Sequence, residues 1–278
     1  MRTEFLTIFW RDMKKFFRSK AMLFTALVQP ALWLALFGVS MSSNFDLIAP
    51  GVPNQLGVVS VNYLTFMAAG VISMTVLFTC LYSGISLQFD KQFGLMKEIV
   101  ASPLPRSHIL LGLSLSGVAK SLIQSAIIVL FGFILGVRFF EGFTIGQMLL
   151  SVLGIVLFIV LFALGLLFLA STVAMKLETH ESLQGVITLL SLPLFFASNA
   201  LYPAASLPLA IKLVSYGNPL SYFITGMRYF SLGSNFYSVG TYYTYGTYEV
   251  LTAFAFLLVF DIFMFLLSLR AIKKTKIV

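Results

Sequence analysis

The side chains that most often carry out chemistry are few in this sequence, and they are not spaced for it. His108 and His180 lie far apart, and neither belongs to an H-E-x-x-H or similar metal-ligand pattern. The single cysteine, Cys80, lies in an apolar run without a basic neighbour that could activate it. No G-x-x-x-x-G-K-S/T phosphate loop and no G-x-S-x-G nucleophile elbow occurs. We therefore expect no catalytic centre, cofactor or metal on this chain.

Two charged residues fall inside otherwise apolar runs. Counted along those runs, Lys120 and Asp261 reach a similar depth in the same half of a bilayer. Charges buried in hydrocarbon are costly and are usually paired. We therefore expect a direct contact between Lys120 and Asp261, or a polar cavity that both share. The alternative is that Lys120 extends to the membrane surface alone, while Asp261 faces another polar group or water.

Composition indicates which elements position these residues. The 278 residues are 59% hydrophobic and 15% aromatic but only 10% charged, whereas soluble domains are about 25% charged. A soluble core could not bury so much apolar surface, so the excess must face lipid. This excludes a soluble enzyme, a disordered protein and a disulfide-stabilised scaffold.

Six apolar runs are long enough to cross a bilayer, which takes about 20 residues. The predicted spans are residues 21–42, 63–88, 109–137, 146–175, 183–202 and 250–270. The fourth belongs to a run too long for one upright helix, so we expect it to tilt or to begin along the interface. The predicted fold is an all-α polytopic membrane protein with six transmembrane helices in one domain, residues 1–278.

The basic residues predict the orientation of these spans. With the N-terminus inside, the cytoplasmic segments would contain most of the 18 Lys and Arg, and the outer segments only Arg138, Lys212 and Arg228. Such a bias follows the positive-inside rule. We expect a plasma or inner membrane with both termini cytoplasmic. The net charge of +8 is then a topological signal that favours membrane lipid, not nucleic acid, as a partner.

The N-terminal segment, residues 3–20, has apolar positions at helical spacing between basic ones. The apolar positions are Phe5, Phe9, Met13, Phe16 and Phe17. This pattern predicts an amphipathic helix in the cytoplasmic interface. The alternative is a plain basic flank that only sets topology.

The outer segment between the fifth and sixth spans contains two helix-start signals. Ser206 precedes Leu207 and Pro208, and Asn218 precedes Pro219. We expect two short helices that re-enter the outer leaflet, the second ending at Gly233. Nine of the 11 tyrosines lie between Tyr202 and Tyr248. They suit an aromatic belt at the membrane interface or a surface on which an exported substrate would stack.

The connection between the second and third spans has the most specific pattern. It reads Phe89-Asp90-Lys91-Gln92-Phe93-Gly94-Leu95-Met96-Lys97-Glu98-Ile99-Val100-Ala101-Ser102-Pro103-Leu104-Pro105-Arg106. Together with Tyr202-Pro203, Leu207-Pro208 and Asn218-Pro219-Leu220-Ser221-Tyr222 through Arg228, it resembles ABC-2 type permeases, the membrane subunits of a class of ATP-driven exporters. Pro105 departs from the family, which more often has a small polar residue there.

The resemblance implies a role for this connection and a set of partners. A short helix over residues 93–100 would dock into a separate ATPase subunit, which would bind the ATP and magnesium. The expected coupling residues are Phe93, Gly94, Leu95, Met96, Lys97, Glu98, Ile99, Pro103 and Arg106. A second copy of the permease, or a related one, would complete the membrane part.

The function that the resemblance implies is export of an amphipathic, lipid-linked or drug-like substrate. The apolar spans and aromatic outer rim favour such a cargo over a small ion. Two alternatives remain open. One is an ion-coupled carrier that uses Asp261, and the other is an ABC-type membrane scaffold that moves no cargo.

Overall fold

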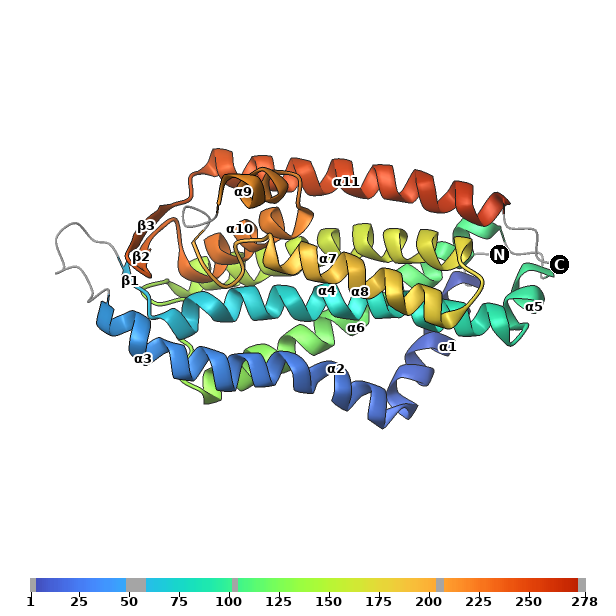
Figure 1. Cartoon of the computed structure of the whole chain (residues 1–278), viewed down its shortest axis with the longest axis horizontal. Coiled ribbons are helices and arrows are strands. Elements are labelled where there is room, and N and C mark those ends of the chain that lie inside the picture. The colour runs from blue at the N-terminus through green and yellow to red at the C-terminus, as the bar shows by residue number, and fades with distance from the viewer. Residues whose placement is uncertain (1–3, 49–58, 102–104, 204–207, 275–278) are drawn as a thin grey trace.

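The computed structural model describes residues 4–48, 59–101, 105–203 and 208–274. This part of the chain is mostly helical, and its long helices lie side by side along the longest axis of the molecule (Figure 1). The start of α1 (Glu4–Arg18), the end of α11 (Thr247–Lys274) and the short helix α5 (Leu95–Ala101) lie at one end of the bundle (Figure 1). The small strands lie at the opposite end.

Five helices among the described residues are long and apolar enough to cross a membrane. They are Ala26–Phe45, α4 (Tyr63–Gln92), α6 (Arg106–Ile134), α7 (Ile145–Lys176) and Thr247–Lys273 of α11. The protein is therefore a multi-pass helical membrane protein. α8 (His180–Phe196) occupies most of the fifth predicted span, but its 17 residues extend only about 26 Å. A hydrocarbon core is about 30 Å thick, so six spans remain a prediction.

The first span is a helix with a local change of pitch. It comprises α2 (Lys20–Leu32), a π-helical segment η1 (Trp33–Gly38) and α3 (Val39–Ile48). Pro30 lies inside α2 and lacks the N–H that would bond the preceding turn. The wider π turn begins three residues later, as is typical where the regular ladder is interrupted.

α4 is the central helix of the bundle. Of its most apolar 18-residue window, 89% is buried, compared with 11% for α11. Neighbouring segments approach α4 closely at its glycines. For example, a Cβ on Gly84 would lie 3.1 Å from the carbonyl oxygen of Ala170 in α7. Most of the apolar surface of α11 faces away from the chain, and one side of it packs on α7.

The segment between α8 and α11 contains two short helices, where two were predicted, and a sheet that the sequence pattern did not indicate. The expected helix start at Ser206 and Leu207 lies outside the described residues, and re-entry of the two helices into the bilayer stays a prediction. The helices are α9 (Leu209–Tyr216) and α10 (Pro219–Leu232). β2 (Asn235–Ser238) and β3 (Thr241–Thr244) form an antiparallel hairpin, and β1 (Val59–Ser60) pairs with β2 in parallel. Val239 and Gly240 both have positive φ, which suits a tight hairpin turn.

Candidate functional site

α1 packs one face against α6. Ile8, Met13 and Phe16 are each at most 6% exposed. The two helices approach closely at Gly112 of α6, where a Cβ would lie 2.8 Å from the carbonyl oxygen of Phe5. α1 is therefore held on the bundle by apolar contacts along most of its length.

The predicted apolar stripe of α1 is only partly the buried one. Met13 and Phe16 are buried and Phe5 and Phe9 are half-buried, but Phe17 is 55% exposed. Trp10, which the predicted stripe did not include, is 61% exposed. Asp12 takes a place on the buried face instead, at 2% exposure. The helix thus has a packed face, an exposed aromatic face and a basic face.

Asp12 is the centre of a buried polar cluster. Its Oδ2 accepts hydrogen bonds from the Lys120 ammonium and the Ser116 hydroxyl, both on α6. Burial alone would raise the pKa of Asp12, but Lys120, helped by Ser116 and Lys15, holds that pKa below its usual value. The carboxyl is therefore a paired anion inside the protein.

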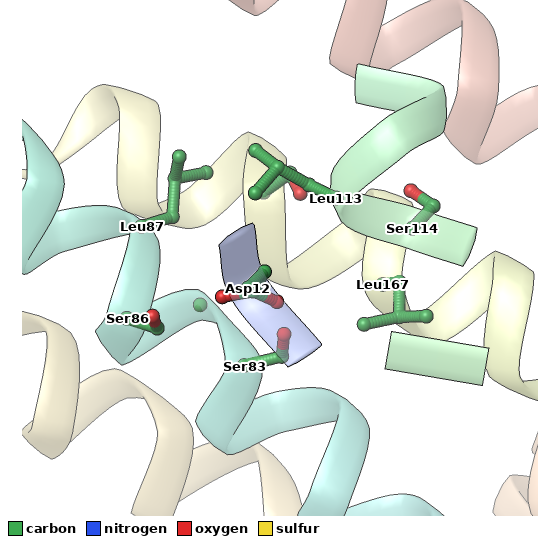
Figure 2. A pocket seen from close by; sticks show the side chains of 9 residues that line it. Asp12, Ser83, Ser86, Leu87, Leu113, Ser114 and Leu167 are labelled. Atoms are coloured by element: carbon green, nitrogen blue, oxygen red, sulfur yellow. The ribbon is translucent and has the colours of Figure 1, made fainter. Parts of the chain in front are cut away.

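A small cavity of about 10 Å³ lies beside this carboxyl. Figure 2 shows Asp12 of α1 between Ser83 and Ser86 of α4 on one side and Ser114 of α6 on another. Leu167 of α7 lies across the same cavity. Four helices that are distant in the sequence thus meet around one carboxylate.

The expected contact of Lys120 with Asp261 is wrong: the ammonium pairs with Asp12. Asp261 lies elsewhere, between α7 and α11, where a Cβ on Gly165 would collide with its Oδ1. Depth along a helix gives one coordinate only, and the face of α6 that carries Lys120 is turned toward α1. The partner of Lys120 comes from α1, outside the predicted spans.

A second acidic residue, Asp90, joins α1 to the end of α4. It is 2% exposed, and its two oxygens accept from Arg11 Nη2 at 2.6 Å and Lys15 Nζ at 2.9 Å. Asp90 lies two residues before α4 ends at Gln92. The basic side of α1 is therefore bonded to the helix end that leads into α5.

The predicted coupling segment is a turn followed by α5. Gly94 has φ +78°, a conformation that glycine adopts without strain. Phe93 is 75% exposed and Leu95 43% exposed, whereas Met96 is buried at 2%. The remaining predicted coupling residues are exposed Lys97 and Glu98, half-buried Ile99 and Arg106, and Pro103, which lies outside the described residues.

The end of α4 is bonded to the connection between α7 and α8. Lys91 Nζ donates to the carbonyl of Leu177 at 2.8 Å, and Gln88 Nε2 donates to that of Glu178 at 2.8 Å. The ring of Phe89 stacks on His180, the first residue of α8, with centroids 4.6 Å apart. α5, which follows this end of α4, is therefore connected through it to α7 and α8.

Arg106 faces the interior of this region. Its Nη1 donates to the carbonyls of Ile272 at 2.7 Å and Lys273 at 3.0 Å. The last carbonyls of a helix have no partner within the helix, and a basic side chain suits them. Arg106 thus connects the start of α6 to the end of α11.

Arg228, in the outer segment, is fully buried. Its Nη2 donates to the carbonyls of Asn199 at 2.8 Å and Ala200 at 3.1 Å, and its guanidinium lies 3.7 Å from the ring centre of Phe66. The arginine therefore joins α10 to the turn after α8 and to α4. Its role is structural in this arrangement.

The other predicted outer residues hold short helices in place. Asn218 caps α10 through Leu220 N at 3.0 Å and donates to Leu194 O at 2.7 Å. Tyr222 donates to Tyr216 O at 2.8 Å. The three prolines are Pro203, which is buried, Pro208, which precedes α9, and Pro219, which begins α10.

Sequence reasoning missed Asp12 as a site residue and gave Asp90 no partner. A signal for Asp12 was present, because it is four residues after Ile8 and four before Phe16 and so shares their helical face. An acidic residue on the apolar face of a basic helix needs a buried cation. Lys120 was the intramembrane cation available.

The chain resembles known membrane permeases over most of its length. The ABC-2 type transporter family matches residues 3–232. The putative transport permease ycf38 of Cyanophora paradoxa is 30% identical to this chain. The match covers 92% of this chain and 84% of the ycf38 chain.

Two bacterial relatives are similar. The daunorubicin resistance ABC transporter permease protein DrrB1 of Streptomyces coeruleorubidus is 25% identical over 84% of this chain and 77% of its own. The inner membrane transport permease YadH of Escherichia coli K12 is 27% identical over 75% of this chain and 76% of the YadH chain. Together with the helical membrane architecture, these matches show that the chain belongs to the ABC-2 type transporter family, as a transport permease.

Proposed function

We propose that this chain is the permease subunit of an ATP-driven exporter, with the ATPase on a separate chain docked at Phe93 and α5. The observation that carries the proposal is the exposed apolar pair Phe93 and Leu95, at the start of α5; α5 lies at one end of the bundle (Figure 1). Apolar anchors on a short exposed helix, flanked by Lys97 and Glu98, suit a cleft on a protein partner.

The contacts behind this surface give the docked partner a route into the membrane. α5 follows α4 almost directly, and Asp90 and Lys91 bond that helix end to α1 and to the α7–α8 connection. Because the sequence contains no phosphate loop, ATP-driven transport by this chain would need such a partner. Movement of α5 would then shift several helices together, opening a route beside a second permease copy.

The proposed topology has six spans, with both termini and α5 in the cytoplasm. α8 would be the fifth crossing in chain order and would bring the total to six. The turn at residues 197–202 would complete it, with α9 and α10 as re-entrant helices. Asn218 supports this, because it bonds the start of α10 to Leu194 near the end of α8. α1 would lie in the cytoplasmic interface, with Trp10 and Phe17 toward lipid.

An amphipathic, lipid-linked or drug-like molecule is the proposed cargo. An apolar cavity of about 400 Å³ lies among α4, α6, α7 and α10, and its lining includes Val129, Phe139 and Ile155. Ligand sites of this size are mostly apolar with few polar groups. One polar group here is Ser125, whose buried hydroxyl has no partner among the described residues.

The test of the docking surface is co-purification with candidate ATPases, followed by an ATPase assay. The variant is Phe93→Asp with Leu95→Asp. Phe93 and Leu95 are exposed, so the introduced aspartates should not disturb folding. The matched control is Phe93→Leu with Leu95→Met, which keeps the surface apolar. We expect the aspartate pair to lose the ATPase subunit or its stimulation, and the control to keep both.

Retention of a fully coupled ATPase by the aspartate pair would contradict the proposed surface. If no ATPase associates with the folded wild-type protein and transport stops when ion gradients collapse, the exporter proposal itself fails. Asp261 would then be the residue to change, to Asn, in a test of ion coupling.

A further inference from the structure

One face of α1 is strongly basic and lines a cavity. Arg11, Lys14, Lys15 and Arg18 follow each other at intervals of three, one and three residues, which places them on one side of a helix. Together with Ser19, Asp90 and Leu95 they line a cavity of about 520 Å³.

The charge of this cavity is not balanced by the protein. Both oxygens of Asp90, the acidic residue in its wall, are taken by Arg11 and Lys15. Among the residues that the structure describes, no carboxylate forms an ion pair with Lys14 or Arg18. The Nε of Arg11 is buried and has no acceptor in the described part of the chain. Four basic side chains thus line this cavity with one shared carboxylate, so the cavity would attract an anion.

The position of the cavity relative to the membrane indicates the source of that anion. α1 ends at Arg18 and α2 begins at Lys20, and the first apolar span begins at Ala26. The corner between α1 and α2 projects from the side of the bundle toward the end that carries α5 (Figure 1). With the first candidate span beginning at Ala26, the proposed topology would place the basic face near the point where the chain enters the bilayer, close to the lipid phosphates.

We propose that this cavity binds the phosphate headgroup of an anionic membrane lipid. Lys14 and Arg18, which have no carboxylate partner, supply most of the attraction, and Arg11 and Lys15 share their donors between the phosphate and Asp90. Exposed Trp10 and Phe17 on α1 contact the acyl chains of neighbouring lipids. The site depends on α1 lying at the membrane surface and not on docking of an ATPase.

Lipid occupancy would also reach the coupling region. A phosphate near Arg11 and Lys15 competes for the donors that hold Asp90, two residues from the end of α4. The cavity includes Leu95 of α5 in its wall. The headgroup is thus placed to loosen the bond between α1 and the helix end that leads to α5.

The test uses tryptophan fluorescence. The chain has two tryptophans, Trp10 and Trp33, so Trp33→Phe leaves a single reporter next to Arg11. The full chain in phosphatidylcholine bilayers is titrated with brominated phosphatidylglycerol, which quenches tryptophan on contact. We expect saturable quenching. Lys14→Gln with Arg18→Gln should weaken the apparent affinity about 30-fold, or roughly fivefold for each charge removed.

Matched controls separate a built site from surface charge in general. Lys20→Gln with Lys176→Gln also removes two positive charges, but from exposed positions outside the cavity. This pair should change the affinity less than about threefold. Lys14→Arg with Arg18→Lys keeps the charge and should bind as the wild type does. Equal weakening by both glutamine pairs would overturn the proposal.

Further arms test the source of the phosphate. Brominated phosphatidylcholine, which has a phosphate but no net charge, should not give saturable quenching; if it does so with the same affinity, the anionic site is refuted. Glycerol phosphate in solution should not relieve quenching by phosphatidylglycerol at equal concentration. If it does, the cavity binds soluble phosphate and the assignment to a membrane lipid is wrong.

Discussion

At the scale of single residues, the buried pair of Lys120 and Asp12 is the main departure from an apolar membrane domain. The side chains are 9% and 3% exposed. Each charge would be costly in this environment without the other. The pair also joins α1, which lies outside the predicted spans, to α6.

A double-mutant cycle measures this coupling. We expect Asp12→Ala and Lys120→Ala each to destabilise the protein by about 3 kcal/mol, because each leaves an unpaired buried charge. The double variant should lose at least about 1 kcal/mol less than the sum. The measurement is denaturant unfolding in micelles, with Lys20→Ala as a control of no effect. Strictly additive losses would show that the two residues do not interact.

The lowered pKa of Asp12 predicts a pH dependence. The carboxylate is favoured in the folded state, so its contribution is complete above its unfolded pKa of about 3.9. It is lost as pH falls through the lower folded pKa. The difference in Tm between the wild type and Asp12→Asn should be constant from about pH 8 to 5 and should shrink below about pH 4. A difference that shrinks near pH 7 would contradict the pairing.

At the scale of elements, α4 organises its neighbours by close approach. The turn after α8 is held from two sides: Arg228 donates to the carbonyl oxygens of Asn199 and Ala200, and Gly70 of α4 lies against the same Ala200 carbonyl. α8, a short helix that contains Pro193, is fixed in this way at its C-terminal end. The position of α8 depends on this turn.

Gly70→Ala tests that contact. A Cβ would collide with a backbone oxygen, which cannot rotate away, so we expect a loss of about 1–3 kcal/mol in unfolding free energy. The matched control is Gly146→Ala in α7, where nothing lies within 4 Å of the new Cβ. It should be neutral or slightly stabilising. Equal effects of the two changes would contradict the close approach.

At the scale of the whole molecule, the number of crossings depends on α8. Single cysteines at Lys20, Lys176, Glu141 and Tyr242 report their sides, since Cys80 is buried and should stay unlabelled. With six spans, a membrane-impermeant maleimide added to intact cells should label Glu141→Cys and Tyr242→Cys, and not the two lysine positions. Labelling of Lys176→Cys and Tyr242→Cys from the same side would show that α8 does not cross.

The sequence alone determined the membrane class, the family, five of the long helices and both short outer helices. These features depend on local quantities: the length of an apolar run, the lack of charge within it, and capping residues such as Asn218. The sequence pattern did not predict the hairpin of β2 and β3, because Val239 in its turn has positive φ, which is uncommon for a β-branched residue. Nothing in the local pattern marks that turn.

Only the tertiary structure decided which charges meet. Lys120 was visible as an intramembrane charge, but its partner is 108 residues away, in a helix outside the apolar spans. Likewise, Arg106 was predicted only as a coupling residue, and its bond to the end of α11 could not be read from the sequence. A helical pattern fixes which residues share a face, whereas packing of several helices fixes what that face meets. The basic cavity of α1 is therefore a property of the fold, although every charge in it can be read from the sequence.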